Sequence, residues 1–223
     1  MPDSDLTTIL FDLDGTLIDT VELIMASYRH TVIAHGYTPV PDDVWLQNLG
    51  IPLRVQFRHF TEEPDEIQAM IATYLKHNLE NHDDMVGHYS GVRRRVVGLK
   101  DAGYRLGLVT SKMHGGLEKG LAAGGYEGVF EVLIGADDVT NAKPHPEPVL
   151  LALERLGVEP ANAVFVGDSP HDMAAGRAAG VRTAAALWGP FDYDVLAPEE
   201  PTYWLETAAD LERFFVRPHP HIG

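Results

Sequence analysis

The sequence predicts an α/β fold: a parallel sheet with helices on both faces and a helical insert after the first strand. Two observations support this prediction. Beyond residue 86, short β-branched or apolar runs alternate with longer segments of helical period, as in parallel sheets covered by helices. Residues 17–86 instead show helical spacing and no convincing strand. We therefore expect an α/β core of residues 1–16 and 87–223, and a helical insert of residues 17–86.

Five strands are expected in the core, each a short apolar or β-branched run. They are Thr7–Phe11, Arg105–Val109, Glu131–Ile134, Ala163–Val166 and Arg182–Ala186. Between the later strands, a helix is expected over Pro148–Leu156, where apolar residues share one face and Gly157 is the stop signal. A second helix is expected over His171–Ala179. The alternation of these elements indicates parallel strand pairing.

Two apolar stripes predict helices within the insert. Their members are Val21, Ile24, Tyr28 and Val32 in the first, and Ile67, Met70, Ile71, Tyr74 and Leu75 in the second. Acidic residues precede the second stripe, which suits a helix N-terminus. Between the stripes, Gly50 and Pro52 interrupt the helical spacing and predict a loop that ends near Arg54.

The charge of the chain limits its partners. It has 33 acidic and 17 basic residues, and the net charge of -16 opposes unassisted binding to nucleic acid or to an anionic membrane face. No apolar run approaches the ~18 residues of a membrane span, and the first residues lack the features of a signal peptide. We expect a cytoplasmic monomer or homodimer.

Cysteine chemistry is excluded, because the chain contains no cysteine. Disulfides, thiolate nucleophiles and cysteine-ligated zinc are therefore absent. The histidines of the tail, His219 and His221, suit a metal site less well than a frayed polar terminus.

Two carboxylates, Asp12 and Asp14, stand just beyond the first expected strand. Open α/β sheets bind ligands at the carboxyl edge of their strands, so this position is a candidate site. Asp14 with Gly15 also suits a turn or a helix N-cap. The pair alone does not decide between a site and a turn.

Three further polar segments follow in order. Thr110 and Ser111 close the second expected strand, Lys143 precedes a proline before a helix, and Asp168 ends the fourth strand, with Asp172 four residues later. Together with the first carboxylates they form four motifs, DLDGT, VTS, KP and GDSPHD. This ordered set resembles the haloacid dehalogenase superfamily over nearly the whole chain.

The resemblance implies a Rossmann-like core and a mobile helical cap that closes over the site and selects the leaving group. Residues 17–86 match such a cap in position and helical pattern. The expected loop over Gly50–Arg54 would face the catalytic edge, where Arg54 would either grip an anionic group of the substrate or remain a surface arginine.

The residue types also suit phosphoryl transfer on chemical grounds. Asp12 can attack phosphorus and form an aspartyl phosphate, which splits one difficult hydrolysis into two easier steps. Mg²⁺ would offset the repulsion between the two anions, held by Asp12, Asp168 and the backbone carbonyl of Leu13. Lys143 would add a second positive charge. Asp172 would either ligate the metal or orient Lys143.

Asp14 is expected to protonate the leaving group and then to activate water, and it is also a candidate metal ligand. As an acid it must hold a proton, which crowding by a second carboxylate favours. Thr110, through its hydroxyl, and Ser111, through its amide, would cradle the phosphoryl oxygens, with Thr16 as a further substrate contact.

Several of these residues also have a structural interpretation. Thr110 and Ser111 suit the cap of the next helix. Lys143 suits a solvated loop, and Asp172 suits a first helical turn. The four motifs taken together favour the catalytic interpretation.

The segments around Asp137 and Trp188 narrow the resemblance to the phosphoglycolate phosphatase branch and its relative that hydrolyses inorganic pyrophosphate. Phosphoglycolate is the first expected substrate and pyrophosphate the second. A phosphosugar mutase is a third alternative. A dehalogenase needs no metal and would leave Asp14 idle. A non-catalytic binding module is disfavoured because Asp12, Asp14 and Asp168 are all present.

Overall fold

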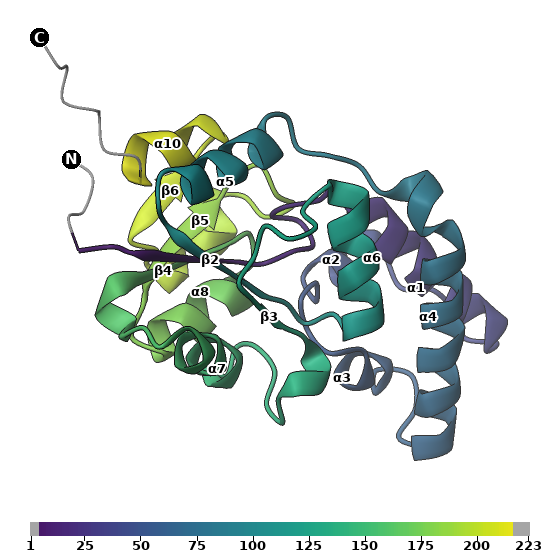
Figure 1. Cartoon of the computed structure of the whole chain (residues 1–223). Helices are drawn as coiled ribbons and strands as arrows, with labels where there is room; N and C mark the ends of the chain where they lie inside the picture. The colour runs from purple at the N-terminus through teal and green to yellow at the C-terminus, as the bar shows by residue number, and fades with distance from the viewer. Residues whose placement is uncertain (1–4, 216–223) are drawn as a thin grey trace, which may run out of the picture.

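The computed structural model describes residues 5–215. Its core is a sheet of six parallel strands in the order β3-β2-β1-β4-β5-β6 (Figure 1). The strands are β1 (Thr8–Phe11), β2 (Arg105–Val109), β3 (Val132–Ile134), β4 (Ala163–Gly167), β5 (Arg182–Ala186) and β6 (Tyr203–Leu205). The predicted α/β class is confirmed.

The five predicted strands are present, with ends that differ by one residue at most. The sixth, β6, was not predicted. It pairs with β5 at the edge of the sheet and has three residues, too few for a period of two to stand out in the sequence. The predicted tail segment around His219 and His221 lies outside the described residues.

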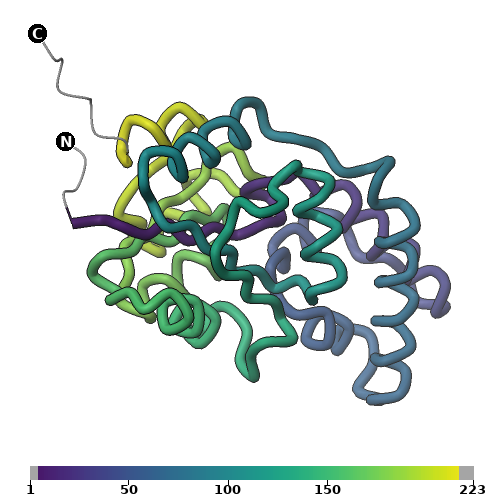
Figure 2. Tube along the Cα trace, in the orientation of Figure 1, coloured from purple at the N-terminus to yellow at the C-terminus, as the bar shows by residue number. Residues whose placement is uncertain are grey.

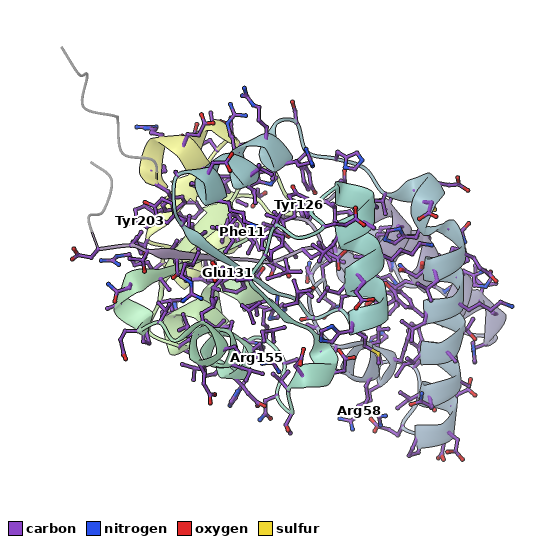
Figure 3. All side chains as sticks on the ribbon, in the orientation of Figure 1. Phe11, Arg58, Tyr126, Glu131, Arg155 and Tyr203 are labelled. Atoms are coloured by element: carbon purple, nitrogen blue, oxygen red, sulfur yellow. The ribbon has the colours of Figure 1, made fainter. Side chains whose placement is uncertain are left out.

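Helices cover both faces of the sheet because alternate strand residues point to opposite sides. Ile9 and Phe11 point to one face of the sheet, where they pack in an apolar cluster with residues of three helices. Leu10 points to the other face and packs in a second apolar cluster with residues of two helices. The first face carries α5 (Val92–Asp101), α6 (His114–Gly124) and α10 (Ala209–Phe215). The second carries α7 (Glu147–Leu156) and α8 (Pro170–Ala178), while α9 (Tyr193–Leu196) follows β5. Figure 2 traces the chain through these elements, and Figure 3 adds the side chains to the ribbon.

The insert forms four helices between β1 and β2 (Figure 1). They are α1 (Val21–Ala34), α2 (Asp42–Leu46), α3 (Leu53–Phe57) and α4 (Pro64–Met85). An aromatic cluster of its own holds them together, in which Tyr28 stacks on Trp45 with ring centroids 4.4 Å apart. The two apolar stripes correspond to α1 and α4. Helix α3 begins inside the segment that was expected to be a loop.

The insert contacts the core at several places, among them α4, where Nζ of Lys119 in α6 donates to the carbonyl oxygen of Leu79 at 2.8 Å. Asp19 and Gly87, one on each connecting segment, exchange backbone hydrogen bonds of 3.0 and 2.7 Å. Leu49, which lies between α2 and α3, packs in one apolar cluster with Met173 and Phe191 of the core. The insert therefore touches the first turns of α8. Among residues 5–215, no helix has the length and apolarity that crossing a membrane requires.

Candidate active site

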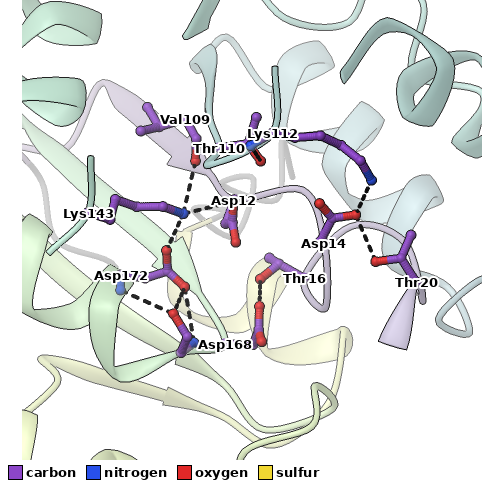
Figure 4. A network of polar contacts seen from close by, with 11 residues as sticks. Asp12, Asp14, Thr16, Thr20, Val109, Thr110, Lys112, Lys143, Asp168 and Asp172 are labelled. Atoms are coloured by element: carbon purple, nitrogen blue, oxygen red, sulfur yellow. Dashed lines mark hydrogen bonds and ion pairs between the residues drawn. The ribbon is translucent and has the colours of Figure 1, made fainter. Parts of the chain in front are cut away.

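The ends of three adjacent strands bring the predicted motifs together. Asp12 follows β1, Thr110 follows β2 and Asp168 follows β4, and β1 lies between the other two strands. Lys143 and Asp172 reach the same place from the segment before α7 and from the first turn of α8 (Figure 4). All five side chains are buried. Parallel pairing thus assembles at one edge residues that are up to 160 positions apart in the chain.

Lys143 is the central cation of the site. Its Nζ lies 2.9 Å from Oδ1 of Asp12 and donates a hydrogen bond of 2.5 Å to Oδ1 of Asp172. A third, longer contact of 3.4 Å reaches the carbonyl oxygen of Val109. Because the side chain of Lys143 is 2% exposed, water does not compete for these contacts.

Burial dominates the electrostatics of the carboxylates. It raises the pKa of Asp12 to about 7; Lys143 opposes this shift, whereas Asp172 and Asp14 add to it. Burial, followed by repulsion from Asp172 and Asp12, raises the pKa of Asp168 well above its usual value. For Lys143, burial lowers the pKa, but the attraction of Asp12 and Asp172 outweighs it and the net shift is upward. The ionised site therefore lacks positive charge.

A divalent cation would supply that charge. Asp12, Asp168 and Asp172 each offer a carboxylate oxygen, and the three oxygens lie within 4.8 Å of one another. Three carboxylates facing one lysine leave two negative charges unbalanced. Oxygen-only, carboxylate-rich ligands are those that Mg²⁺ prefers. The donor set thus fits the ion that the sequence predicted.

A second group with similar spacing already has partners for one of its carboxylates. His114, Asp137 and Asp138 also place ligand atoms within 4.8 Å of one another. Asp138, however, accepts a 2.6 Å contact from His114 and a 2.9 Å ion pair from Arg155. Burial tends to raise the pKa of Asp138, but the Gly135 amide, His114 and Arg155 together lower it to about 2. Asp138 is therefore already satisfied by partners from the chain, unlike the three buried carboxylates.

Asp168 is held by Thr16, which the sequence predicted as a substrate contact, and it occupies space that two glycines leave free. Thr16 donates a 2.6 Å hydrogen bond to Oδ1 of Asp168. A Cβ built on Gly15 would lie 2.5 Å from Oδ2 of Asp168, and one on Gly189 would lie 2.4 Å from its Cβ. Trp188 donates from Nε1 to the carbonyl oxygen of Thr16 at 2.9 Å. Trp188 therefore holds the backbone of Thr16, and Gly189 leaves room for Asp168, roles that sequence spacing does not reveal.

Asp14 does not join the three clustered carboxylates. Its Oδ1 accepts two hydrogen bonds of 2.7 Å, one from Nζ of Lys112 and one from the hydroxyl of Thr20. Figure 4 shows this pair of donors. Neither Lys112 nor Thr20 was predicted, although Lys112 directly follows the VTS motif.

Thr110 and Ser111 carry hydroxyl groups at the same edge. The Thr110 hydroxyl accepts a 3.2 Å hydrogen bond from the amide of Lys112, so its own hydrogen remains available to a further acceptor. The Ser111 hydroxyl oxygen is buried and has no hydrogen-bond partner within the described chain. A buried hydroxyl without a partner is costly, and a bound anion would satisfy it.

Two predicted residues lie in other settings. The carbonyl oxygen of Leu13 accepts hydrogen bonds from the amides of Leu17 and Ile18 at 2.9 and 3.2 Å, which directs it into a turn. Arg54 is exposed and donates from Nη2 to Gln68 of α4 at 3.3 Å. Among the described residues, the hydrogen bonds of Leu13 and Arg54 are made away from the clustered carboxylates.

Comparisons with known proteins agree with this geometry. Residues 9–186 match the model of the haloacid dehalogenase-like hydrolase family. Pyrophosphatase PpaX of Bacillus velezensis is 43% identical over 211 residues, which cover 95% of this chain and 97% of that protein. Pyrophosphatase PpaX of Halalkalibacterium halodurans is 37% identical over 207 residues, covering 93% and 95%.

Solved structures show the same architecture. A haloacid dehalogenase-like hydrolase from Bacteroides fragilis superposes with a TM-score of 0.86 at 27% identity, covering 92% of this chain and 99% of that one. A predicted phosphoglycolate phosphatase from Haemophilus somnus has a TM-score of 0.83 at 24% identity, covering 94% and 98%. The chain therefore belongs to the haloacid dehalogenase-like hydrolase family.

Proposed function

We propose that this protein is a Mg²⁺-dependent hydrolase of inorganic pyrophosphate that works through an aspartyl phosphate on Asp12. The observation that carries the proposal is the buried group in which Lys143 contacts Asp12 at 2.9 Å beside two further carboxylates. The choice of pyrophosphate reverses the order of the two expected substrates. It is favoured because relatives 37–43% identical over nearly the full chain are named pyrophosphatases.

Asp12, Asp168 and Asp172 would hold the ion, with Thr16 orienting Asp168 through its 2.6 Å hydrogen bond. The bound ion supplies positive charge that offsets repulsion between the carboxylate and the phosphoryl oxygens. Leu13 is not assigned to the ion, since its carbonyl oxygen already accepts the amides of Leu17 and Ile18. Asp172, whose oxygens accept from Lys143 and Ser169, joins the ion through a remaining lone pair. Lys143 supplies the remaining positive charge and orients Asp12.

In the first step, an oxygen of Asp12 forms a bond to phosphorus while the bond from phosphorus to the bridging oxygen breaks. The leaving phosphate takes a proton from Asp14. In the second step, Asp14 accepts a proton from water as the water oxygen attacks phosphorus, and the bond to Asp12 breaks. One acid–base group thus serves both halves of the cycle, as the chemistry of a covalent intermediate requires.

We assign the hydroxyl groups of Thr110 and Ser111 to the phosphoryl oxygens as hydrogen-bond donors, and for Ser111 the hydroxyl takes the place of the backbone amide that the sequence predicted. The free hydrogen of Thr110 and the unpartnered hydroxyl of Ser111 suit phosphoryl oxygens. We assign the helical insert, residues 17–86, the role of a cap that excludes water and contacts the leaving group. Arg54 has no role in this cap, since it points to Gln68.

A substrate panel tests the proposal. Pyrophosphate, phosphoglycolate, a sugar phosphate and a nucleotide are incubated with the unmodified protein in Mg²⁺ or in EDTA, beside Asp12→Asn. The expected result is release of phosphate from pyrophosphate, with Mg²⁺ and the unmodified protein only. Preference for phosphoglycolate would overturn the choice of substrate. Turnover by Asp12→Asn at the unmodified rate would overturn the mechanism.

A further inference from the structure

One turn of α8 serves both the active site and the contact with the helical insert. Asp172 uses Oδ1 to accept from Lys143 at 2.5 Å. Its Oδ2 accepts from the hydroxyl of Ser169 at 2.6 Å and from the Ser169 amide at 3.0 Å. Asp172 is fully buried and Ser169 is 4% exposed. The orientation of Lys143 therefore depends on a carboxylate that Ser169 fixes from its other side.

Gly50 of the insert lies beside Ser169. A Cβ built on Gly50 would lie 3.5 Å from the Ser169 hydroxyl oxygen and 3.6 Å from Cδ2 of His171. Gly50 has a φ of +88°, which only glycine adopts without strain. Leu49, its neighbour, packs in one cluster with Met173, one turn further along α8. The docked insert thus covers the turn that holds Asp172.

Ser169 is also the N-cap of α8, and that role alone does not account for its strongest bond. A capping side chain needs an acceptor oxygen, and the amide of Asp172 reaches the Ser169 oxygen at 3.3 Å. The shorter bond of 2.6 Å uses the single hydroxyl hydrogen and points to the carboxylate instead. Exclusion of water strengthens such a bond, and water at Ser169 would compete for it.

We propose that Ser169 is a positioning residue that links docking of the insert at Gly50 to the orientation of Lys143, through Asp172. When the insert lies on α8, the Ser169 hydroxyl has Asp172 as its partner and Lys143 is held toward Asp12. When the insert lifts, water reaches the hydroxyl and Asp172 loosens. The inference rests on the proposed phosphotransfer role of Lys143.

A double-mutant cycle on kcat for pyrophosphate with Mg²⁺ tests this link. Ser169→Ala is expected to lower kcat by about 10- to 100-fold with little change in KM, since it misplaces a catalytic group rather than removing a substrate contact. Ser169→Thr, which keeps the hydroxyl, is expected to restore most of the activity. Gly50→Ala, which strains the docked segment, is expected to lower kcat by about 10-fold. In the double variant, the loss should equal that of Ser169→Ala alone.

Two controls separate the link from general destabilisation. Gly36→Ala strains another left-handed glycine of the insert, which has no atom near its Cβ position, and should leave kcat unchanged. Asp192→Ala removes the N-cap of α9, whose side chain accepts from Val195, and should also leave kcat unchanged. The link would be overturned if the kcat losses of Ser169→Ala and Gly50→Ala multiplied in the double variant. It would also be overturned if Ser169→Thr did not restore kcat. Absence of turnover by the unmodified protein would instead refute the proposed function.

Discussion

Lys143 contacts Asp12 at 2.9 Å and donates to Asp172 at 2.5 Å, so one buried ammonium group bridges two buried carboxylates. Asp12, the expected nucleophile at the end of β1, is therefore held by a residue that lies 131 positions later in the chain. The buried ammonium group of Lys143 is tolerated because it is paired with both carboxylates. Without it, the two carboxylates would repel each other with no compensating charge.

Lys143→Met should therefore abolish most activity. The variant keeps the length of the side chain but not its charge, and a fall in kcat of about 10²- to 10³-fold is expected, as for loss of one preorganised electrostatic contact. The free energy of unfolding should fall by about 3–5 kcal/mol, because breaking a buried ion pair leaves charge unpaired. Steady-state kinetics and urea denaturation measure the two effects. Lys100→Met, at an exposed lysine of α5, is the matched control and should change neither.

The pKa of Asp12 gives a pH dependence of stability. Its folded value of about 7 lies above the ordinary 3.8, so the unfolded chain ionises more readily. The contribution of Asp12 to the free energy of unfolding is therefore fully present below about pH 3.8 and is lost as the pH rises through about 7. In EDTA, Asp12→Asn should be more stable than the unmodified protein at about pH 8, with an advantage that shrinks towards about pH 5.

Thermal denaturation at a series of pH values measures that difference. Asp101→Asn, at an exposed aspartate at the end of α5, should follow the unmodified protein throughout. An advantage of Asp12→Asn that grows on acidification would contradict the burial of an ionisable Asp12.

Gly189→Ala should weaken metal binding. The new Cβ would lie 2.4 Å from Cβ of Asp168 and 2.8 Å from the carbonyl oxygen of Gly15, so the carboxylate must move. Displacing a ligand by altering its support typically costs about 10- to 100-fold in metal affinity. Calorimetric titration with Mg²⁺ measures the change. Gly98→Ala adds a methyl group in α5 where no atom lies within 4 Å, and its affinity should equal that of the unmodified protein.

Asp14→Asn should lower kcat for pyrophosphate by about 10²- to 10⁴-fold, the usual contribution of a general acid–base group. Asparagine can still accept from Lys112 and Thr20, which hold Asp14 at 2.7 Å, so the fold should be retained. Phosphate release from pyrophosphate is the measurement. An activity within a few-fold of the unmodified protein would remove Asp14 from the mechanism.

The sheet was predictable from the sequence because β-branched and apolar runs recur at the spacing of parallel strands. The meeting of Asp12, Lys143 and Asp168 followed from motif order and from the rule that ligands bind at the carboxyl edge. Strand β6 was not predictable, since three residues show no period. The orientation of Arg54 toward α4 was also hidden, because it depends on where α3 begins.

The residues that surround and hold the reacting groups were the hardest to predict from the sequence. Gly15 and Gly189 flank Asp168, although they are 174 positions apart, and only the folded chain brings them together. Lys112 was one residue beyond a motif and binds Asp14 through a contact that spacing does not specify. Motifs thus identify the reacting groups, whereas the residues that hold them depend on tertiary packing.

The most direct test of the account is to locate the phosphoryl group. Asp14→Asn is mixed with pyrophosphate and Mg²⁺, quenched in acid and digested, and the peptides are weighed by mass spectrometry. Phosphate is a weakly basic leaving group and needs an acid less than the attacking water needs a base, so Asp14→Asn should slow the second step more than the first. The covalent intermediate should then accumulate, with one added phosphoryl group on Asp12. The same experiment with Asp12→Asn in addition should show none. A phosphoryl group on another residue, or none on Asp12 while phosphate is released, would contradict the account.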